Sequence, residues 1–295
     1  MVLLDGKSLF SKIKLELSNE VKGMRARGSK LPHLAAILVG DDPASETYIN
    51  AKIKACNEIG FDSSVFRYPQ DVSESILLDK INEINKSEDI DGLIVQLPLP
   101  NHIDENLITH SISPQKDVDG FHPINIGRMV LGLSCFIPAT PFGIVSLLDE
   151  YSIETSGKKC LVIGRSHIVG TPISILMSRN KKRGNSTVTL AHSRTKDLKS
   201  LTKDEDIIII AIGVPKFLNA SMIKKDVVII DVGIHRISSD QTKSGYKLVG
   251  DVDFDDVQNK VSYITPVPGG VGPMTIASLL RNTLFSAKKI IYSHT

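Results

Sequence analysis

Four polar side chains in the first half of the chain have types and positions that suit catalysis. Tyr48 and Lys52 are four residues apart in a segment with helical periodicity, so they share one helix face. Gln96 is an amide within the apolar segment 91–100, which predicts a buried strand broken by prolines. Asp119 belongs to the segment KDVDGF. Ordinary structural roles remain open: a solvated helix face for the pair, backbone bonding for the amide, and a turn for the carboxylate.

A second set of residues surrounds a glycine turn in the second half of the chain. The strand-like segment KKCLVIG runs into GRSHIVGTP, which places Gly164 at a strand end and Gly170 near a helix start. Such a turn directs backbone N–H groups and the positive helix end toward a phosphate. Ser166 and Val169 replace the second and third glycines of the dinucleotide pattern, so an ordinary strand-to-helix turn is the alternative. The turn opens a second α/β series, and this context favours a dinucleotide.

The segment after the next strand favours NADP over NAD. NAD-binding domains usually carry an Asp or Glu about 20 residues beyond the glycine turn, whereas this chain reads AHSRT. The Ser193 hydroxyl, with the guanidinium groups of Arg165 and Arg194, suits a 2′-phosphate. A solvated surface charge is the alternative for either arginine, and for Arg194 the two interpretations are equally open.

The elements that position these residues alternate between strand and helix, which predicts the α/β class. An amphipathic helix over 8–27 precedes the apolar run 34–40, a second helix ending at Gly60, a short strand and a helix after Ser73. Strands apolar along their whole length indicate a parallel sheet covered on both faces. After a helix from Pro141 to near 153, six short Val/Ile-rich strands predict a Rossmann-type doubly wound domain.

Two domains suit a chain of 295 residues, and the seam between the two series falls near residues 120–140. We expect an N-terminal catalytic domain over residues 1–139, completed by a C-terminal helix over 274–295 that returns to it. The dinucleotide domain would occupy residues 140–273, with a cleft between the two domains.

Composition excludes several classes of protein. With 41% hydrophobic residues, 23% charged residues and a net charge of +2, the chain resembles a soluble globular protein without a nucleic-acid partner. The three cysteines form no C-x-x-C pair and the histidines show no zinc-binding spacing, so no metal is expected. Asp5 interrupts any secretory signal, and no apolar run approaches membrane length. We therefore expect a cytoplasmic protein that binds no membrane.

Seven segments together resemble the bifunctional methylenetetrahydrofolate dehydrogenase/methenyltetrahydrofolate cyclohydrolase family. They occur in the family's order and span nearly the whole chain: VGDDPAS…Y…K at 39–52, VQLPLP at 95–100, KDVDGFHP at 116–123, PATP at 138–141, GRSxxVGxP at 164–172, GDVDF at 250–254 and TPVPGGVGPMT at 265–275. The resemblance implies oxidation of 5,10-methylenetetrahydrofolate with NADP, followed by hydrolysis to 10-formyltetrahydrofolate, within one-carbon metabolism.

The same resemblance implies roles for individual residues. Tyr48 would lie against the folate ring, Lys52 would be the catalytic amine, and Gln96 would help set the protonation of that lysine. Asp119 would pair with the amino-pyrimidinone edge of the pterin, and Asp117 is the weaker candidate. The implied substrate set is Tyr48, Lys52, Gln96, Asp119, Pro268, Gly269, Gly270, Gly272 and Thr275. The implied cofactor set is Gly164, Arg165, Ser166, Ser193, Gly213, Ile234 and Thr140.

The implied chemistry divides into two steps with different demands. Neighbouring nitrogens stabilise the cation left by hydride loss, so the first step needs positioning more than a base. Hydration needs proton transfer, and a lysine acts as a base only when it is neutral. A monofunctional folate dehydrogenase or related dinucleotide enzyme, and a catalytically silent dinucleotide-binding protein, are the alternatives. A homodimer is a further expectation from the family.

Overall fold

The computed structural model describes residues 1–240, 242 and 245–292. The chain divides into two compact units, and each is described by itself. Unit 1 comprises Met1–Ser11 and Thr140–Thr275, and unit 2 comprises Lys12–Ala139 and Ile276–Thr295. Residues 1–11 therefore group with the second half of the chain, unlike the expected boundary, because strand β1 (Val2–Leu3) pairs with strand β11 (Val261–Ile264).

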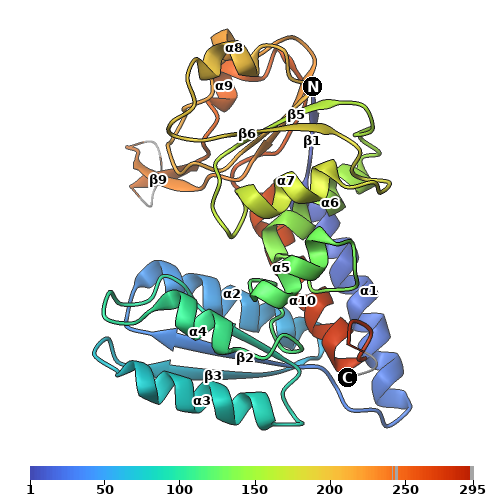
Figure 1. Cartoon of the computed structure of the whole chain (residues 1–295), viewed down its shortest axis with the longest axis vertical. Helices are drawn as coiled ribbons and strands as arrows, with labels where there is room; N and C mark the ends of the chain where they lie inside the picture. The colour runs from blue at the N-terminus through green and yellow to red at the C-terminus, as the bar shows by residue number, and fades with distance from the viewer. Residues whose placement is uncertain (241, 243–244, 293–295) are drawn as a thin grey trace. The chain divides into compact units, whose positions relative to one another are not determined.

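Unit 2 is built on a three-stranded parallel sheet in the order β3-β2-β4. Its strands are β2 (His33–Val39), β3 (Asp62–Tyr68) and β4 (Gly92–Val95), and its helices are α2 (Pro43–Ile59), α3 (Glu74–Lys86), α4 (Glu105–Ser111) and α5 (Pro123–Val130). Helix α1 (Gly6–Ala26) lies mostly in this unit. Helices α2 and α3 lie on opposite faces of the sheet (Figure 1), as the uniformly apolar strands predicted.

Alternation along the strands explains how both faces are buried. Ala35, Ile37 and Val39 of β2 share one core cluster with apolar side chains of α3. The intervening residues of β2 are also buried and point to the other face, where α2 contacts the sheet. Asp42 begins α2 by accepting the backbone N–H of Ser45 at 2.7 Å.

Helix α10 (Val271–Ala287) packs its last turns into unit 2. The Ser286 hydroxyl lies 2.7 Å from the Asp91 carbonyl oxygen and 2.8 Å from the Gln115 carbonyl oxygen. The Asn282 amide donates to the carbonyl of Val118 at 2.8 Å. The helix ends at Ala287, so the expected span 274–295 was too long, and its last three residues lie outside the described residues.

Unit 1 contains a six-stranded parallel sheet in the order β1-β11-β8-β7-β5-β6. Its further strands are β5 (Lys159–Ile163), β6 (Thr187–Ala191), β7 (Ile207–Ile210) and β8 (Val227–Asp231), and its helices are α6 (Ala139–Glu150), α7 (Gly170–Ser178), α8 (Leu198–Thr202), η1 (Ala220–Met222) and α9 (Phe254–Val257). The chain leaves β5 for β6 on one side and then returns to β7 on the other. The switch point of this doubly wound sheet therefore lies between β5 and β7.

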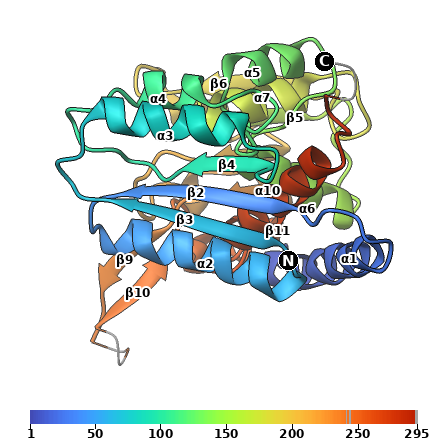
Figure 2. The ribbon, with the colours of Figure 1, turned by 90° about the horizontal axis from the view of Figure 1, so that it is seen from below.

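Two features of unit 1 differ from the expected strand series. The segment YKLVGDV forms β10 (Tyr246–Val249), which pairs antiparallel with β9 (His235–Ser238) in a separate two-stranded sheet. Both strands lie outside the parallel sheet (Figure 2), and the sequence analysis did not predict β9. Its alternation of half-buried and exposed residues is the pattern of an edge hairpin and not of a central strand. In the described ranges, no helix is long and apolar enough to span a membrane.

Candidate active site and dinucleotide site

Helix α2 and the end of β4 bring three of the predicted catalytic residues into unit 2's candidate site. Tyr48 and Lys52 are one turn apart on α2, where the tyrosine is exposed and the lysine is half-buried. The Lys52 Nζ atom donates to the Gln96 Oε1 atom at 3.2 Å. Strand β4 ends at Val95 and not near residue 100 as expected, so Gln96 is the first residue after the strand. The amide therefore occupies the carboxyl edge of the sheet, where ligands bind in open α/β folds.

The half-buried Asp119 completes this group. Burial raises the pKa of its carboxyl group, and the positive charge of Lys52 opposes that rise. The four residues predicted as catalytic all belong to unit 2. They offer an aromatic ring, an amine, an amide and a carboxylate, which together can bind a flat polar ligand and transfer a proton.

Asp117 has a different task from its neighbour. It is 2% exposed, and its oxygens accept the backbone N–H groups of Gly120, Phe121 and His122 and the side-chain amide of Asn125. Burial is the largest effect and raises its pKa to about 7. All of these bonds hold the loop that carries Asp119, so Asp117 anchors the loop and presents no oxygen to a ligand. The weaker of the two carboxylate candidates is thus structural.

The predicted phosphate turn follows β5 in unit 1. Gly164 has φ +112, and a Cβ atom there would lie 2.2 Å from the Ala211 carbonyl oxygen. Only glycine fits this close approach of two loops at the switch point. The Ser166 hydroxyl accepts the backbone N–H of Val169 at 3.1 Å, which shapes the turn and leaves the hydroxyl proton free to donate. Helix α7 then begins at Gly170.

The loop after β6 lies beside this turn because the strands are in register. Ile163 pairs with Ala191, so Arg165 and Ser193 each follow that pair by two residues, and both are exposed. Arg194 is exposed next to them. The sheet edge therefore carries a hydroxyl and two guanidinium groups, and no carboxylate occupies residues 191–195. This set fits a phosphorylated ribose.

The loops after β7 and β8 carry two further residues predicted to bind the cofactor. Gly213 has φ +70, and nothing lies within 4 Å of the position a Cβ atom would take. Ile234 is 46% exposed, which is high for a large apolar side chain beside a sheet edge. The open space at Gly213 would let the backbone contact a dinucleotide, and the apolar surface of Ile234 would suit one of its flat rings.

The glycine-rich segment 268–272 belongs to unit 1. A Cβ atom on Gly270 would lie 2.6 Å from the Thr265 side chain, so packing within the unit already requires this glycine. Gly269 has φ +113, and its carbonyl accepts the Lys7 N–H at 3.0 Å. Gly272 alone has open space around it. Packing within unit 1 thus gives Gly270 a role besides the predicted close approach of a ligand.

Two hydroxyl groups meet at the ends of helices in unit 1. The Oγ1 atoms of Thr140 and Thr275 are 3.0 Å apart, although the residues are 135 positions apart in the sequence. Both side chains are half-buried. The first was predicted to line the cofactor site and the second the substrate site. Pro268 precedes this region and follows a cis peptide bond.

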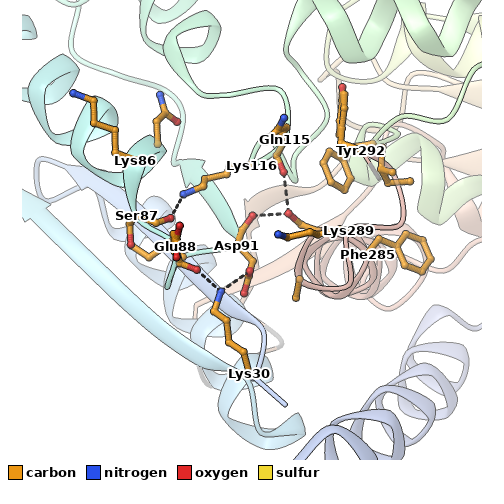
Figure 3. Close-up of a pocket in the computed structure, with 16 residues that line it drawn as sticks. Lys30, Lys86, Ser87, Glu88, Asp91, Gln115, Lys116, Phe285, Lys289 and Tyr292 are labelled. Atoms are coloured by element: carbon orange, nitrogen blue, oxygen red, sulfur yellow. Dashed lines mark hydrogen bonds and ion pairs between the residues drawn. The ribbon is translucent and has the colours of Figure 1, made fainter. Parts of the chain in front are cut away.

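A separate cavity of about 470 Å³ lies in unit 2 at the amino end of β4 (Figure 3). Its lining includes none of the predicted site residues. Lys30 bonds to the Glu88 carbonyl at 2.7 Å and to Asp91 at 2.6 Å, and Lys116 bonds to the Ile84 carbonyl at 2.6 Å and to Ser87. The two lysines therefore donate hydrogen bonds to carbonyl groups at and just after the carboxyl end of α3, and Lys30 also pairs with the Asp91 carboxylate. Among the residues 1–240, 242 and 245–292, no group of metal-binding side chains is assembled.

The sequence analysis missed two buried carboxylates of unit 1, Asp231 and Asp251. Asp231 ends a strand-like apolar run two residues before Gly233, and Asp251 follows such a run after the single residue Gly250. An acidic residue at the end of an otherwise apolar strand was the available signal, because a buried carboxylate needs several donors. Both accept backbone N–H groups of loops at the dinucleotide edge.

The fold and these residues define an α/β protein with a doubly wound dinucleotide-binding unit and a second unit that bears a lysine-centred site. Comparison with known proteins gives the family. The catalytic-domain profile of tetrahydrofolate dehydrogenase/cyclohydrolase matches residues 4–119, and its NAD(P)-binding-domain profile matches residues 138–291. The chain belongs to the tetrahydrofolate dehydrogenase/cyclohydrolase family.

Individual relatives match over nearly their whole length. The "Bifunctional protein FolD" of Cytophaga hutchinsonii is 60% identical over 287 residues, which cover 97% of this chain and 99% of the relative. The crystal structure of a bifunctional methylenetetrahydrofolate dehydrogenase/cyclohydrolase from Campylobacter jejuni has a TM-score of 0.92 at 48% identity and covers 98% and 99% of the two chains. The Trypanosoma brucei enzyme, complexed with NADP cofactor and inhibitor, has a TM-score of 0.92 at 34% identity and covers 99% of each chain.

Proposed function

We propose that this protein oxidises 5,10-methylenetetrahydrofolate to 5,10-methenyltetrahydrofolate with NADP, and then hydrolyses the product to 10-formyltetrahydrofolate. The observation that carries the proposal is the hydrogen bond between Lys52 and Gln96 in a family member. A dinucleotide-binding protein without catalysis would not need an amine held by an amide. The proposed catalytic residues are Tyr48, Lys52, Gln96 and Asp119.

The first step depends on the position of the folate. NADP, when bound, accepts the hydride from the methylene carbon. Asp119 would accept two parallel N–H bonds from the pterin edge, which also favours its charged form. Tyr48 would lie against the ring system, and its exposed position leaves its face open to a ligand. Because the substrate's own nitrogens stabilise the resulting cation, no residue needs to act as a strong base here.

The second step assigns the base to Lys52. Lys52 must first give up its own proton, because only the neutral amine is a base. Water then adds to the methenyl carbon, and its proton passes to that amine. Gln96 would hold that amine by the hydrogen bond already present, so the nitrogen faces the water. The bond from the carbon to nitrogen 5 then breaks as the carbinol O–H loses its proton and becomes the formyl C=O. Lys52 returns the water proton to nitrogen 5, so the 10-formyl product forms with net release of one proton.

The dinucleotide would use residues of unit 1. We assign the phosphate turn to Gly164, Arg165 and Ser166, and the 2′-phosphate to Arg165 and Ser193. Gly213, Ile234 and Thr140 would line the rest of the cofactor site. The family resemblance also assigns the glycine loop from Pro268 to Gly272, with Thr275, to the folate substrate. Unit 2 is then the folate domain and unit 1 the NADP domain, in a cytoplasmic homodimer.

One spectrophotometric experiment tests the proposed function. The protein is mixed with methylenetetrahydrofolate and either NADP or NAD, and nucleotide reduction is followed together with methenyl absorbance. A separate sample receives methenyltetrahydrofolate without any dinucleotide. We expect reduction of NADP and accelerated hydrolysis in the second sample. Oxidation without hydrolysis would identify a monofunctional dehydrogenase, and neither reaction would identify a binding protein.

A further inference from the structure

A buried carboxylate in unit 1 holds the loop that follows β7. Asp251 is 0% exposed. Its Oδ2 atom accepts the backbone N–H groups of Ile212 at 2.8 Å and Gly213 at 3.2 Å, and its Oδ1 atom accepts the N–H of Val214 at 3.0 Å. The His235 Nε2 atom lies 2.8 Å from the same Oδ1 and donates the fourth bond. One side chain therefore fixes three consecutive peptide groups.

A second carboxylate holds the first one in place. Asp231, at the end of β8, accepts the backbone N–H of Asp251 at 2.9 Å and that of Val252 at 3.0 Å. It also accepts the N–H of Gly233 at 2.9 Å. The loops after β7, β8 and β10 are thus joined through two acidic side chains. A Cβ atom on Gly250 would lie 1.8 Å from an oxygen of Asp231, so this glycine makes room for the carboxylate.

The anchored loop lies where a dinucleotide would bind. Ile210 pairs with Ile163 in the sheet, so the residues after β7 lie beside the turn at Gly164. Gly213 sits in the middle of the anchored loop, in the left-handed conformation and open to ligand. Any shift of residues 212–214 would move this wall of the switch point.

We propose that Asp251 is a positioning residue for the dinucleotide, acting through the backbone of residues 212–214, with Asp231 holding it in register. The proposal rests on the proposed function and concerns binding of NADP, not the transfer of hydride. Asp251 itself is fully buried and contacts loop peptides, so it acts through the loop.

The hydrogen-bond geometry makes Asp251→Asn an informative substitution. All four groups around Asp251 are donors, and a carboxylate offers two acceptor oxygens to them. An amide keeps the same shape but turns one oxygen into an NH2 group, which cannot accept. Asp251→Asn therefore leaves one or two buried N–H groups unpaired and frees part of the loop.

The test compares Asp251→Asn with wild type in the full chain. We expect the Kd for NADP, measured by titration calorimetry, to rise about ten-fold or more, which corresponds to about 1.4 kcal/mol. The KM for NADP should rise while kcat at saturating NADP changes less. Hydrolysis of methenyltetrahydrofolate without dinucleotide should stay near the wild-type rate, because unit 2 supplies that chemistry. The exposed Asp255, replaced by Asn, is the matched control.

Two results would overturn the proposal: wild-type NADP affinity in a folded Asp251→Asn protein, or equal loss of NADP binding and methenyl hydrolysis. If Asp251→Asn does not fold, His235→Ala is tested in its place. His235 is half-buried and supplies one of the four hydrogen bonds to Asp251, so this variant removes a single donor. A Kd raised about two-fold or more would support the proposal, and an unchanged Kd would contradict it. Loss of NADP affinity in a chain whose wild type catalyses neither reaction would support the anchor and reject the proposed function.

Discussion

The Lys52 Nζ atom lies 3.2 Å from the Gln96 Oε1 atom, and the hydrogen bond between them joins residues 44 positions apart. Gln96 also donates through Nε2 to the Leu97 carbonyl at 2.8 Å, which settles the orientation of its amide. Its oxygen is therefore fixed toward the lysine. Lys52 held in this way should serve hydrolysis, which needs a base, far more than hydride transfer.

Replacing Lys52 should separate the two reactions. Lys52→Met keeps an unbranched stem but removes the amine, and general base catalysis is worth about a hundred-fold to ten-thousand-fold. Hydrolysis of methenyltetrahydrofolate, corrected for the spontaneous reaction, should collapse by that order, while NADP reduction keeps a larger fraction of its rate. Lys54→Met, on the same helix but exposed, is the control. Wild-type hydrolysis in Lys52→Met would remove the lysine from the base role.

Replacing Asp119 should weaken both reactions together. Asp119→Ala leaves the pterin donors without a partner, at a cost of about 2 to 4 kcal/mol. Titration with a folate analogue should show the loss directly as a higher Kd. Asp89→Ala removes an exposed carboxylate on the amino side of β4 and should leave affinity unchanged. Equal folate affinity in Asp119→Ala and wild type would make Asp119 a turn residue only.

Replacing Arg165 should reduce the preference for NADP over NAD. We expect wild type to use NADP with a higher kcat/KM than NAD. Arg165→Ala should lower the NADP value more than the NAD value, because only NADP has the 2′-phosphate. The exposed Lys199 in α8, replaced by Ala, controls for general loss of positive charge. A wild-type preference for NAD would reject the assignment of Arg165 and Ser193.

Asp231 should make stability depend on pH. Burial raises its pKa from 3.8 to about 7, so the folded chain holds this proton more tightly than the unfolded chain. Its contribution to the free energy of unfolding should therefore fall as pH rises from about 4 to about 7. Urea unfolding at about pH 5.5 and about pH 8 should show a steeper decline in wild type than in Asp231→Asn. Parallel declines would mean that this carboxyl group does not titrate in that range.

The sequence predicted the α/β class and the Rossmann-type unit because its parallel strands are apolar along their whole length. Strand β9 escaped prediction, since half-exposed strands carry a weaker pattern, and β10 was predicted as a strand of the parallel series. Tyr48 and Lys52 share a helix face by spacing alone, but no periodicity could reveal that Gln96 meets Lys52, because that contact depends on how α2 packs on the sheet. The sequence offered a signal for Asp231 and Asp251 at the ends of apolar runs, but it could not identify their donors, which come from three separate loops.

The order in which the ribosome makes the chain limits when unit 2 can complete its fold. Residues 276–292 belong to it, yet they are synthesised after every residue of unit 1. Asn282 and Ser286 then satisfy carbonyl groups of segments that emerged from the ribosome more than 140 residues earlier. Unit 2 therefore stays incomplete until the end of α10 has been made, although its sheet is synthesised first.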